Sequence, residues 1–261
     1  MRKTLLGVVH LPPLLSASRS QTAFDEILTR ALRDAEALKV GGVDGVIVEN
    51  FGDAPFHKGT KDDPVPPDVP AALAVVAREV RRVIGVPVGI NCLRNDGYAA
   101  LGAAAVAGAF WVRINVFTSA MVTDQGLIDG EAARLCAYRK LLGAKVAILA
   151  DLLVKHAVPL AEIPLEVAAR DLAERSGAAG LIVSGSRTGE AVDAHHLART
   201  KAAVGAFPVW IGSGLTQENA RLLWPLCDGA IVGTAFKREG NVQAPVDPAR
   251  VRALSELLPR G

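Results

Sequence analysis

Short apolar runs recur along the chain and alternate with longer stretches in which apolar and charged residues are mixed. The short runs contain almost no polar residue, which is typical of strands that are buried on both faces of a parallel sheet. Eight of them are predicted as strands: residues 5–9, 45–49, 86–91, 110–115, 146–151, 180–184, 209–212 and 230–233.

The longer stretches have the spacing of amphipathic helices. In residues 24–39, apolar side chains such as Ile27, Ala31 and Leu38 recur at helical spacing, with charges on the opposite face. Further helices are predicted at residues 71–83, 98–107, 130–142, 165–176, 194–203, 217–223 and 248–258.

Strand and helix therefore alternate along the whole chain, which predicts an α/β protein: a single (β/α)8 TIM barrel over residues 1–261. The length of 261 residues fits the roughly 250 typical of this barrel, and no linker marks a domain boundary. A doubly wound open sheet is the competing fold, because the sequence does not show whether the strand order reverses. The long irregular segment 51–70, after the second strand, is expected to lie over the barrel mouth.

Composition narrows the classes of function. Half of the residues are hydrophobic, 21% are charged and the net charge is +2, so a compact fold is expected and a nucleic-acid partner is not. The three cysteines are far apart, which fits a reducing compartment and gives no metal-ligand spacing. No apolar run reaches the roughly 20 residues of a membrane span, and no signal peptide is recognisable. We therefore expect a cytoplasmic homo-oligomer without a transmembrane segment.

Polar residues follow the first five predicted strands. In TIM barrels, the carboxyl ends of the strands and the loops after them form the active site. Barrel mouths also need polar groups to satisfy the backbone, but five strands that end in proton-transfer or anion-binding groups favour a functional site. The residues expected to bind the substrate are His10, Arg94, Asp96, Arg113 and Asp124.

Acid–base chemistry is expected from carboxylates and amines at this mouth, where burial and neighbouring charges shift the pKa of such groups. Asp151 is the first candidate, and the alternative is that it pairs with Lys155 or caps the loop backbone. The predicted catalytic residues are Asp151, Glu49, Lys155, His156, Asn91 and Asn115.

The loops after the last two predicted strands contain glycine and hydroxyl residues. Glycine lets the backbone approach a ligand closely, and amides at a helix start surround a phosphate well. In TIM barrels, the loops after the seventh and eighth strands also frequently bind phosphate. Lys237 could add a charge, and Ser186 could contribute beside Ser184. The predicted phosphate-binding residues are Ser184, Gly185, Gly212, Ser213, Gly214, Gly233 and Thr234.

A divalent metal is a less favoured possibility. His10, Glu49, Asp151 and His156 offer nitrogen and oxygen ligands at one end of the predicted barrel. The usual hydrolytic signatures, His-x-His and His-Glu-x-x-His, are absent from the sequence. The cofactor therefore stays unassigned.

Several long motifs resemble the BtpA family. They are GVVHLPPL from Gly7, DGVIVENFGDAPF from Asp44, GINCLRND from Gly89, RINVFTSAMVTDQG from Arg113, ADLLVKHA from Ala150, GSGLTQEN from Gly212 and DGAIVGTAFKREG from Asp228. The resemblance implies a TIM barrel of the ribulose-phosphate-binding type. The family is named for photosystem I biogenesis, yet related members occur among sugar-uptake genes and in organisms without photosynthesis, so the name constrains the function poorly.

Three functions follow from these observations. The favoured one is an enzyme that binds a phosphorylated small metabolite, a phosphosugar or nucleotide-like compound, and performs lyase, isomerase or aldolase-like chemistry; Lys155 as an imine-forming amine is one variant. The first alternative is a non-catalytic factor in the assembly or stability of a membrane complex such as photosystem I. The second is a metal-dependent hydrolase.

Overall fold

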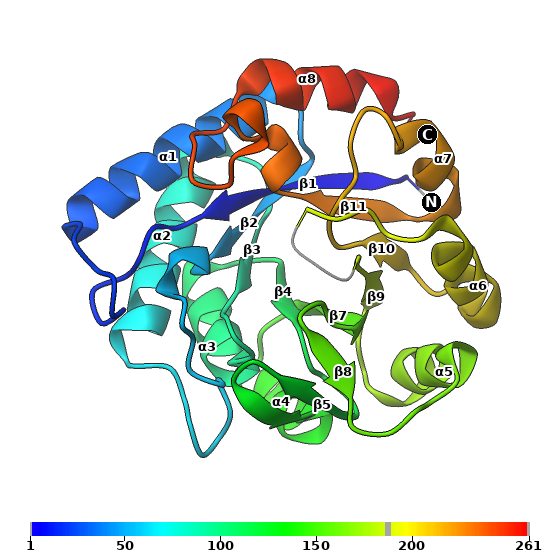
Figure 1. The fold of residues 1–261 in the computed structure, drawn as a ribbon. Coiled ribbons are helices and arrows are strands. Elements are labelled where there is room, and N and C mark those ends of the chain that lie inside the picture. The colour runs from blue at the N-terminus through cyan, green and yellow to red at the C-terminus, as the bar shows by residue number, and fades with distance from the viewer. Residues whose placement is uncertain (1, 186–188, 260–261) are drawn as a thin grey trace.

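The computed structural model describes residues 2–185 and 189–259, and within them eight parallel strands close into a barrel. The last strand of the chain pairs with the first, as Figure 1 shows in a view along the barrel. The closed barrel confirms the TIM-barrel prediction and excludes the open sheet. The strands are, in spatial order, β1 (Thr4–His10), β2 (Gly45–Glu49), β3 (Val88–Asn91), β4 (Trp111–Ile114), β7 (Ala147–Leu153), β9 (Gly180–Val183), β10 (Val209–Ile211) and β11 (Gly229–Val232).

The helices form a ring outside the strands (Figure 1). They are α1 (Phe24–Gly41), α2 (Asp68–Ile84), α3 (Gly97–Ala107), α4 (Ala132–Leu141), α5 (Leu165–Arg175), α6 (Ala194–Val204), α7 (Ala220–Leu223) and α8 (Pro248–Leu257). The main hydrophobic core lies between this ring and the outward faces of the strands, where residues such as Leu5, Val9 and Leu38 are fully buried.

Helix α7 differs from its prediction, because it begins at Ala220 and not at residue 217. Asn219 explains the late start. Its side-chain oxygen accepts a hydrogen bond from the amide of Thr216, and its side-chain nitrogen donates to the carbonyl of Gly214. These bonds satisfy backbone groups in a loop conformation, so the helix does not reach the glycines after β10.

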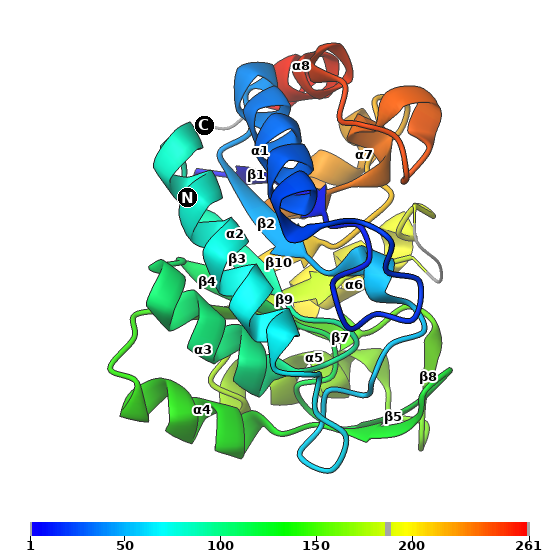
Figure 2. The same cartoon turned by 90° about the vertical axis from the view of Figure 1, so that its left-hand side faces the viewer.

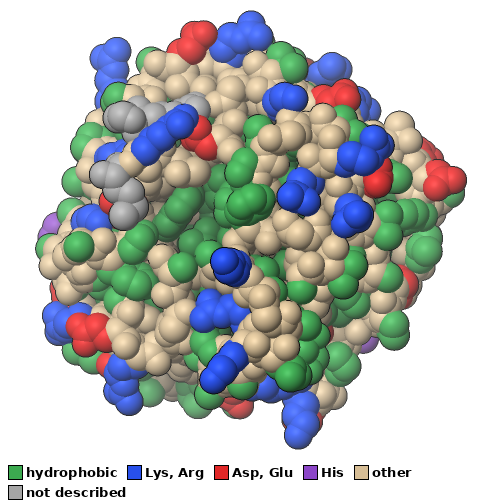
Figure 3. All heavy atoms as spheres, turned by 180° about the vertical axis from the view of Figure 1, so that it is seen from behind, with side chains coloured by type: hydrophobic (Ala, Val, Ile, Leu, Met, Phe, Trp, Pro, Cys, Tyr) green, Lys and Arg blue, Asp and Glu red, His purple; other side chains and the backbone are tan. Residues whose placement is uncertain are grey.

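The barrel interior changes from apolar to polar along the strands. Along β1, Leu6 and Val8 belong to the inner hydrophobic cluster, and His10 follows them at the same period of two. Near the amino ends, the indole ring of Trp111 lies directly against Gly89, where any Cβ atom would collide with it. Trp210 packs with the same inner cluster. Among the described residues of the barrel interior, polar side chains therefore collect toward the carboxyl ends of the strands. The opposite, amino-terminal face shows Lys and Arg side chains between hydrophobic ones (Figure 3).

A small antiparallel sheet beyond the carboxyl ends of the barrel was not predicted. It consists of β5 (Ala120–Thr123), β6 (Gly126–Asp129) and β8 (Ala157–Pro159), in the order β6-β5-β8. Figure 2 shows β5 and β8 outside the barrel on the side of its mouth. Strands of three or four residues with mixed polarity carry little sequence signal, and β8 joins from a distant part of the chain.

The predicted loop at residues 51–70 ends earlier than expected, because α2 already starts at Asp68. It opens with the 3₁₀ turn Phe51–Asp53. Phe51, Gly52, Ala54 and Phe56 line a cavity at the barrel mouth. The loop therefore forms part of the wall of the candidate site.

Candidate active site

Parallel pairing places four predicted site residues in one row across neighbouring strands. His10 on β1 is in register with Glu49 on β2, Glu49 with Asn91 on β3, and Asn91 with Arg113 on β4. Inward direction and register together bring these side chains to the barrel mouth, although more than a hundred residues separate the first from the last. The structure thus gathers the strand-end residues that the sequence singled out.

Glu49 is held by the neighbouring strands. Asn91 donates a hydrogen bond to its carboxylate at 2.6 Å, and His10 Nε2 lies 3.8 Å from its other oxygen. Burial and the charge of Lys237 lower the pKa of His10 to about 3, so the imidazole is neutral and its contact with Glu49 is not an ion pair. Gly233 leaves room for this ring, because a Cβ atom there would be 2.6 Å from His10 Cε1.

Arg113 and Asp151 form a buried ion pair. Arg113 Nε and Nη2 donate to the two carboxylate oxygens at 3.1 and 2.9 Å, and Asn115 donates to the same carboxylate at 2.8 Å. Burial opposes the Arg113 charge, but Asp151 and Glu49 together more than offset this and raise the pKa of Arg113. The Asp151 side chain is fully buried. The alternative prediction that Asp151 pairs with Lys155 is therefore wrong. Asp151 instead orients the Arg113 side chain.

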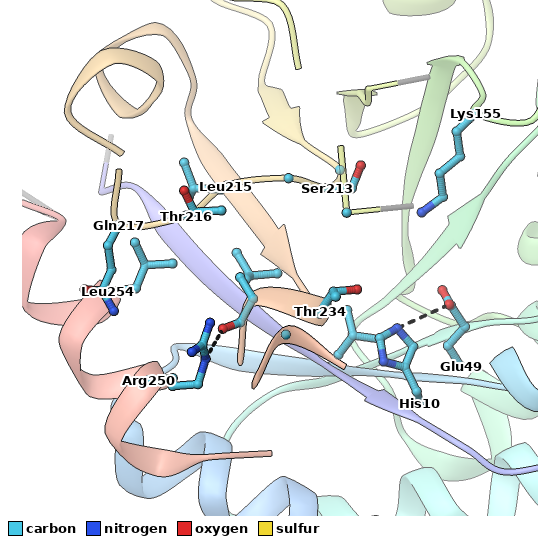
Figure 4. Close-up of a pocket in the computed structure, with 18 of the residues that line it drawn as sticks. His10, Glu49, Lys155, Ser213, Leu215, Thr216, Gln217, Thr234, Arg250 and Leu254 are labelled. Carbon is cyan, nitrogen blue, oxygen red and sulfur yellow. Dashed lines mark hydrogen bonds and ion pairs between the residues drawn. The ribbon is translucent and has the colours of Figure 1, made fainter. Parts of the chain in front are cut away.

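Lys155 projects from the chain after β7 into the mouth (Figure 4). The register of β7 shifts between Asp151 and Leu153, and such bulges redirect side chains near active sites. Burial and the charge of Arg113 lower the pKa of Lys155 to about 8. Within the described residues, its amino group makes no hydrogen bond. An uncommitted amine that loses its proton near neutral pH is suited to proton transfer or to attack on a carbonyl.

One cavity of about 240 Å³ joins the glycine loops to these groups. Figure 4 shows the hydroxyls of Ser213 and Thr234 between Lys155 and Glu49 on one side and Arg250 on the other. The predicted phosphate-binding residues on its wall are Gly212, Ser213, Gly214, Gly233 and Thr234.

The loops that line this cavity present free hydrogen-bond donors. In the part of the chain that the structure describes, the amides of Ser213, Gly214, Leu215, Thr234 and Ala235 donate to no protein acceptor. The hydroxyl of Ser213 is buried and has no partner there either. Such a group of donors fits an oxyanion such as phosphate. The expected helix start is absent after β10, where α7 begins only at Ala220, whereas Thr234 and Ala235 open the 3₁₀ turn Thr234–Phe236.

Arg250 is a cavity residue that sequence reasoning missed. It reaches the cavity from α8, and its Nε donates to the carbonyl of Ala235 at 2.9 Å. Lys237, predicted to supply this charge, instead donates to Asp34 on α1 at 2.7 Å and is almost fully buried. The prediction for Lys237 is therefore wrong. Helix position alone could not reveal Arg250, because arginine on an outer helix usually faces solvent.

A second cavity, of about 340 Å³, adjoins the first and shares Glu49, Arg113 and Lys155 with it. Other predicted site residues on its wall are Asn91, Arg94, Asn115, Asp124 and His156. Asn91 and Asn115 each have a buried side-chain oxygen without a protein partner in the described structure. Such oxygens can accept hydrogen bonds from hydroxyl or amino groups of a ligand.

Some predicted residues lie away from both cavity walls. Asp96 caps α3 by accepting from the amide of Ala99, and its other oxygen accepts from Val65. Ser184 contacts the buried pair of Arg113 and Asp151 and lines neither of the two cavities. Gly185 also lies off these walls, and Ser186 falls outside the described residues.

The predicted metal-ligand set is not assembled. Among the described residues, no group of three or more His, Cys, Asp or Glu side chains is arranged to hold a metal ion. Both carboxylate oxygens of Asp151 accept hydrogen bonds from Arg113, so Asp151 does not join His10, Glu49 and His156 in one set of metal ligands. The low-ranked hypothesis of a site formed by these four residues is therefore wrong.

The closed eight-stranded barrel, with its polar carboxyl-terminal mouth, defines the chain as a TIM-barrel protein. It belongs to the BtpA family, whose model matches residues 1–260. It is 44% identical over 257 residues to the photosystem I biogenesis protein BtpA of Synechocystis, covering 98% of this chain and 88% of that protein. It is 42% identical over 256 residues to an uncharacterized protein of Pyrococcus furiosus, covering 98% and 95%.

Solved structures of the same fold include phosphate-ester enzymes by name. Orotidine 5'-phosphate decarboxylase from Pyrococcus horikoshii matches with a TM-score of 0.59 and 14% identity, covering 97% of each chain. Thiamine phosphate pyrophosphorylase from Pyrococcus furiosus matches with a TM-score of 0.58 and 13% identity, covering 97% of this chain and 94% of that one. At such identity, these matches show the fold alone. Across the described residues, no helix has the length and apolar character needed to span a bilayer.

Proposed function

We propose that this protein is an enzyme that acts on a phosphorylated small metabolite by acid–base chemistry. The phosphate would bind to the donors of the loops after β10 and β11, and Lys155 and Glu49 would transfer protons at the carbon skeleton. One observation carries the proposal: a single cavity has unused amide donors along the glycine loops and, facing them, an uncommitted amine and a carboxylate.

The electrostatics support this assignment of roles. Arg113 is neutralised by Asp151, and His10 is neutral, so Lys155 and Glu49 are the groups at the strand ends of this cavity that remain to exchange protons. The other carboxylate on the cavity wall, Glu218, belongs to the loop after β10 and lies on the side of the phosphate donors. Arg250 adds a positive charge on the side of the cavity formed by the loops. The names of two structural neighbours mention phosphate-bearing compounds, which agrees with this ligand class.

A non-catalytic role in assembling a membrane complex is the second candidate, because a 44% identical relative is named for photosystem I biogenesis. The 42% identical relative from Pyrococcus furiosus, however, carries no such name. A small-molecule site inside the barrel does not require that complex, and it therefore remains the first candidate.

The test begins with ligand pairs that differ only in phosphate, such as ribose 5-phosphate and ribose, compared by thermal unfolding. A phosphorylated ligand at about 100 times its Kd should raise the free energy of unfolding by about 2.7 kcal/mol, and its unphosphorylated partner should not. Ser213→Asp should abolish the effect, because it puts a negative charge beside the phosphate donors. Ser18→Asp, at an exposed position in the loop after β1, should leave the effect intact.

The stabilising ligand is then incubated with the protein in deuterium oxide. Acid–base chemistry predicts exchange of a carbon-bound proton, seen by proton NMR, and loss of this exchange in Lys155→Met. Binding without exchange would favour a non-catalytic role. Equal stabilisation by phosphorylated and unphosphorylated ligands would refute the phosphate site.

A further inference from the structure

Arg94 is a buried cation that forms no ion pair with any described residue. It follows β3, is 5% exposed, and lines the second cavity. Its Nη2 donates to the carbonyl of Lys155 at 2.7 Å. Within the described residues, its guanidinium forms no ion pair and no other hydrogen bond.

This arrangement is costly unless a ligand completes it. A buried charge without a partner is unfavourable, and burial accordingly lowers the pKa of Arg94. Arg113, on the neighbouring strand β4, shows the contrast, because Asp151 accepts two of its hydrogen bonds. The Asp124 carboxylate accepts from its neighbour Gln125 and lies in an exposed residue, so it does not fill this role.

The wall of the second cavity carries more cations than carboxylates, even with Arg113 set aside because Asp151 neutralises it. The other cations are Arg19, Arg94 and Lys155, and the carboxylates are Glu49 and Asp124. A guanidinium presents a planar pair of donors that matches the two oxygens of a carboxylate or phosphate. The cavity also meets the phosphate cavity at Glu49, Arg113 and Lys155.

We infer that the substrate carries two anionic ends, a phosphate at the β10 and β11 loops and a second oxyanion, carboxylate or phosphate, that pairs with Arg94. The inference rests on the proposed function and narrows its substrate class. The reacting carbons lie between the two ends, beside Lys155 and Glu49, where the cavities join. Arg94 would also keep Lys155 in place through the carbonyl hydrogen bond.

Three ligands of matched carbon length test the second end: glucitol 6-phosphate, gluconate 6-phosphate and glucitol 1,6-bisphosphate. Calorimetric titration of the full chain should show that one or both of the doubly anionic ligands bind about tenfold more tightly than glucitol 6-phosphate, as one charge-assisted pair implies. The two doubly anionic ligands distinguish carboxylate from phosphate at Arg94. Equal affinities for all three would overturn the second anionic subsite and leave the phosphate site standing.

Variants assign the preference to Arg94. In Arg94→Gln, the doubly anionic ligands should bind within about twofold of glucitol 6-phosphate, whose own affinity stays as before. The control is Arg19→Gln, at an exposed residue of the same cavity, which should keep the roughly tenfold preference for the doubly anionic ligands. Arg94→Lys keeps the charge and should keep part of the preference, which covers the case that the Gln variant fails to fold. An unchanged preference in Arg94→Gln would refute the role of Arg94. No binding of any phosphorylated ligand would refute the proposed function and this inference with it.

Discussion

At the scale of single residues, the site depends on which charges have partners. Asp151 was the leading catalytic candidate, but its two oxygens are occupied by Arg113 and Asn115. Lys155 has the opposite situation, since its amino group has no hydrogen-bond partner in the described structure. Both are polar residues near the end of one strand. Their hydrogen-bond partners alone show that Asp151 orients a neighbour and that Lys155 is available to react.

The pKa of Lys155 gives a prediction at this scale. Burial and Arg113 lower it from 10.5 to about 8, so the neutral amine forms as the pH rises through 8. A reaction that needs this amine should gain rate over that range and level off above it. Carbon-13 NMR of reductively methylated protein should show one lysine that titrates near 8, against about 10.4 for exposed lysines.

The signal near pH 8 is assigned by its loss in Lys155→Arg. Lys39, at the exposed end of α1, provides the control when it is changed to Arg, since this variant should keep the signal. Titration of Lys155 near 10 would contradict both the burial argument and its proposed role.

At the scale of elements, the site depends on loop positions where the packing leaves no room for a side chain, so that only glycine fits. Gly214, after β10, has φ +74, and a Cβ atom there would collide with the carbonyl oxygen of Glu190. The same turn presents the amides of Ser213, Gly214 and Leu215 to the cavity. Glycine at position 214 therefore lets two loops pack together and leaves donors free for an anion.

Gly214→Ala should lose about 3 kcal/mol or more of unfolding free energy, from left-handed strain and collision together, and should also lose stabilisation by phosphorylated ligands. Gly85→Ala is the matched control, because φ is +66 there and no atom lies within 4 Å of the added Cβ. It should cost about 1–2 kcal/mol and leave ligand binding unchanged. Urea denaturation with and without ligand measures both effects, and equal losses in the two variants would contradict the collision.

At the scale of the whole molecule, the barrel closes by joining the two ends of the chain. β1 pairs with β11, and α1 packs on α8. Lys237, after β11, donates to Asp34 on α1 at 2.7 Å, and Asp34 also accepts from the amide of Val246. This buried pair ties the last strand's loop to the first helix.

Lys237→Met should lower the free energy of unfolding by up to about 3–5 kcal/mol, because it removes the buried partner of Asp34 and leaves only the exposed Arg33, 3.3 Å away, to offset its charge. Adding Asp34→Asn should recover most of this loss, since the amide keeps the bond from Val246 without the charge. Arg30→Gln removes an exposed ion pair with Glu26 and should cost no more than about 1 kcal/mol. Denaturant unfolding checks all three. Failure of the double variant to recover stability would show that the charge is not the cause.

The sequence by itself determined the alternation of buried strands and amphipathic helices, because continuous apolar runs and a helical period can both be read locally. The closure of the strands into a barrel, which excludes the open sheet, was decided by the tertiary structure. Polar residues at strand ends, such as His10, Glu49 and Arg113, were found for the same reason. The small sheet of β5, β6 and β8 and the cavity position of Arg250 were decided only by tertiary structure, since they depend on which distant segments meet.

The roles of the charges were also decided by tertiary structure. Whether Asp151 faces Arg113 or Lys155, and whether Lys237 faces the cavity or Asp34, depends on side-chain direction and on the register between strands distant in sequence. A charge's energy depends on its partners and its burial. The order of residues along the chain shows which charges are available, and the folded barrel determines which of them remain for a ligand.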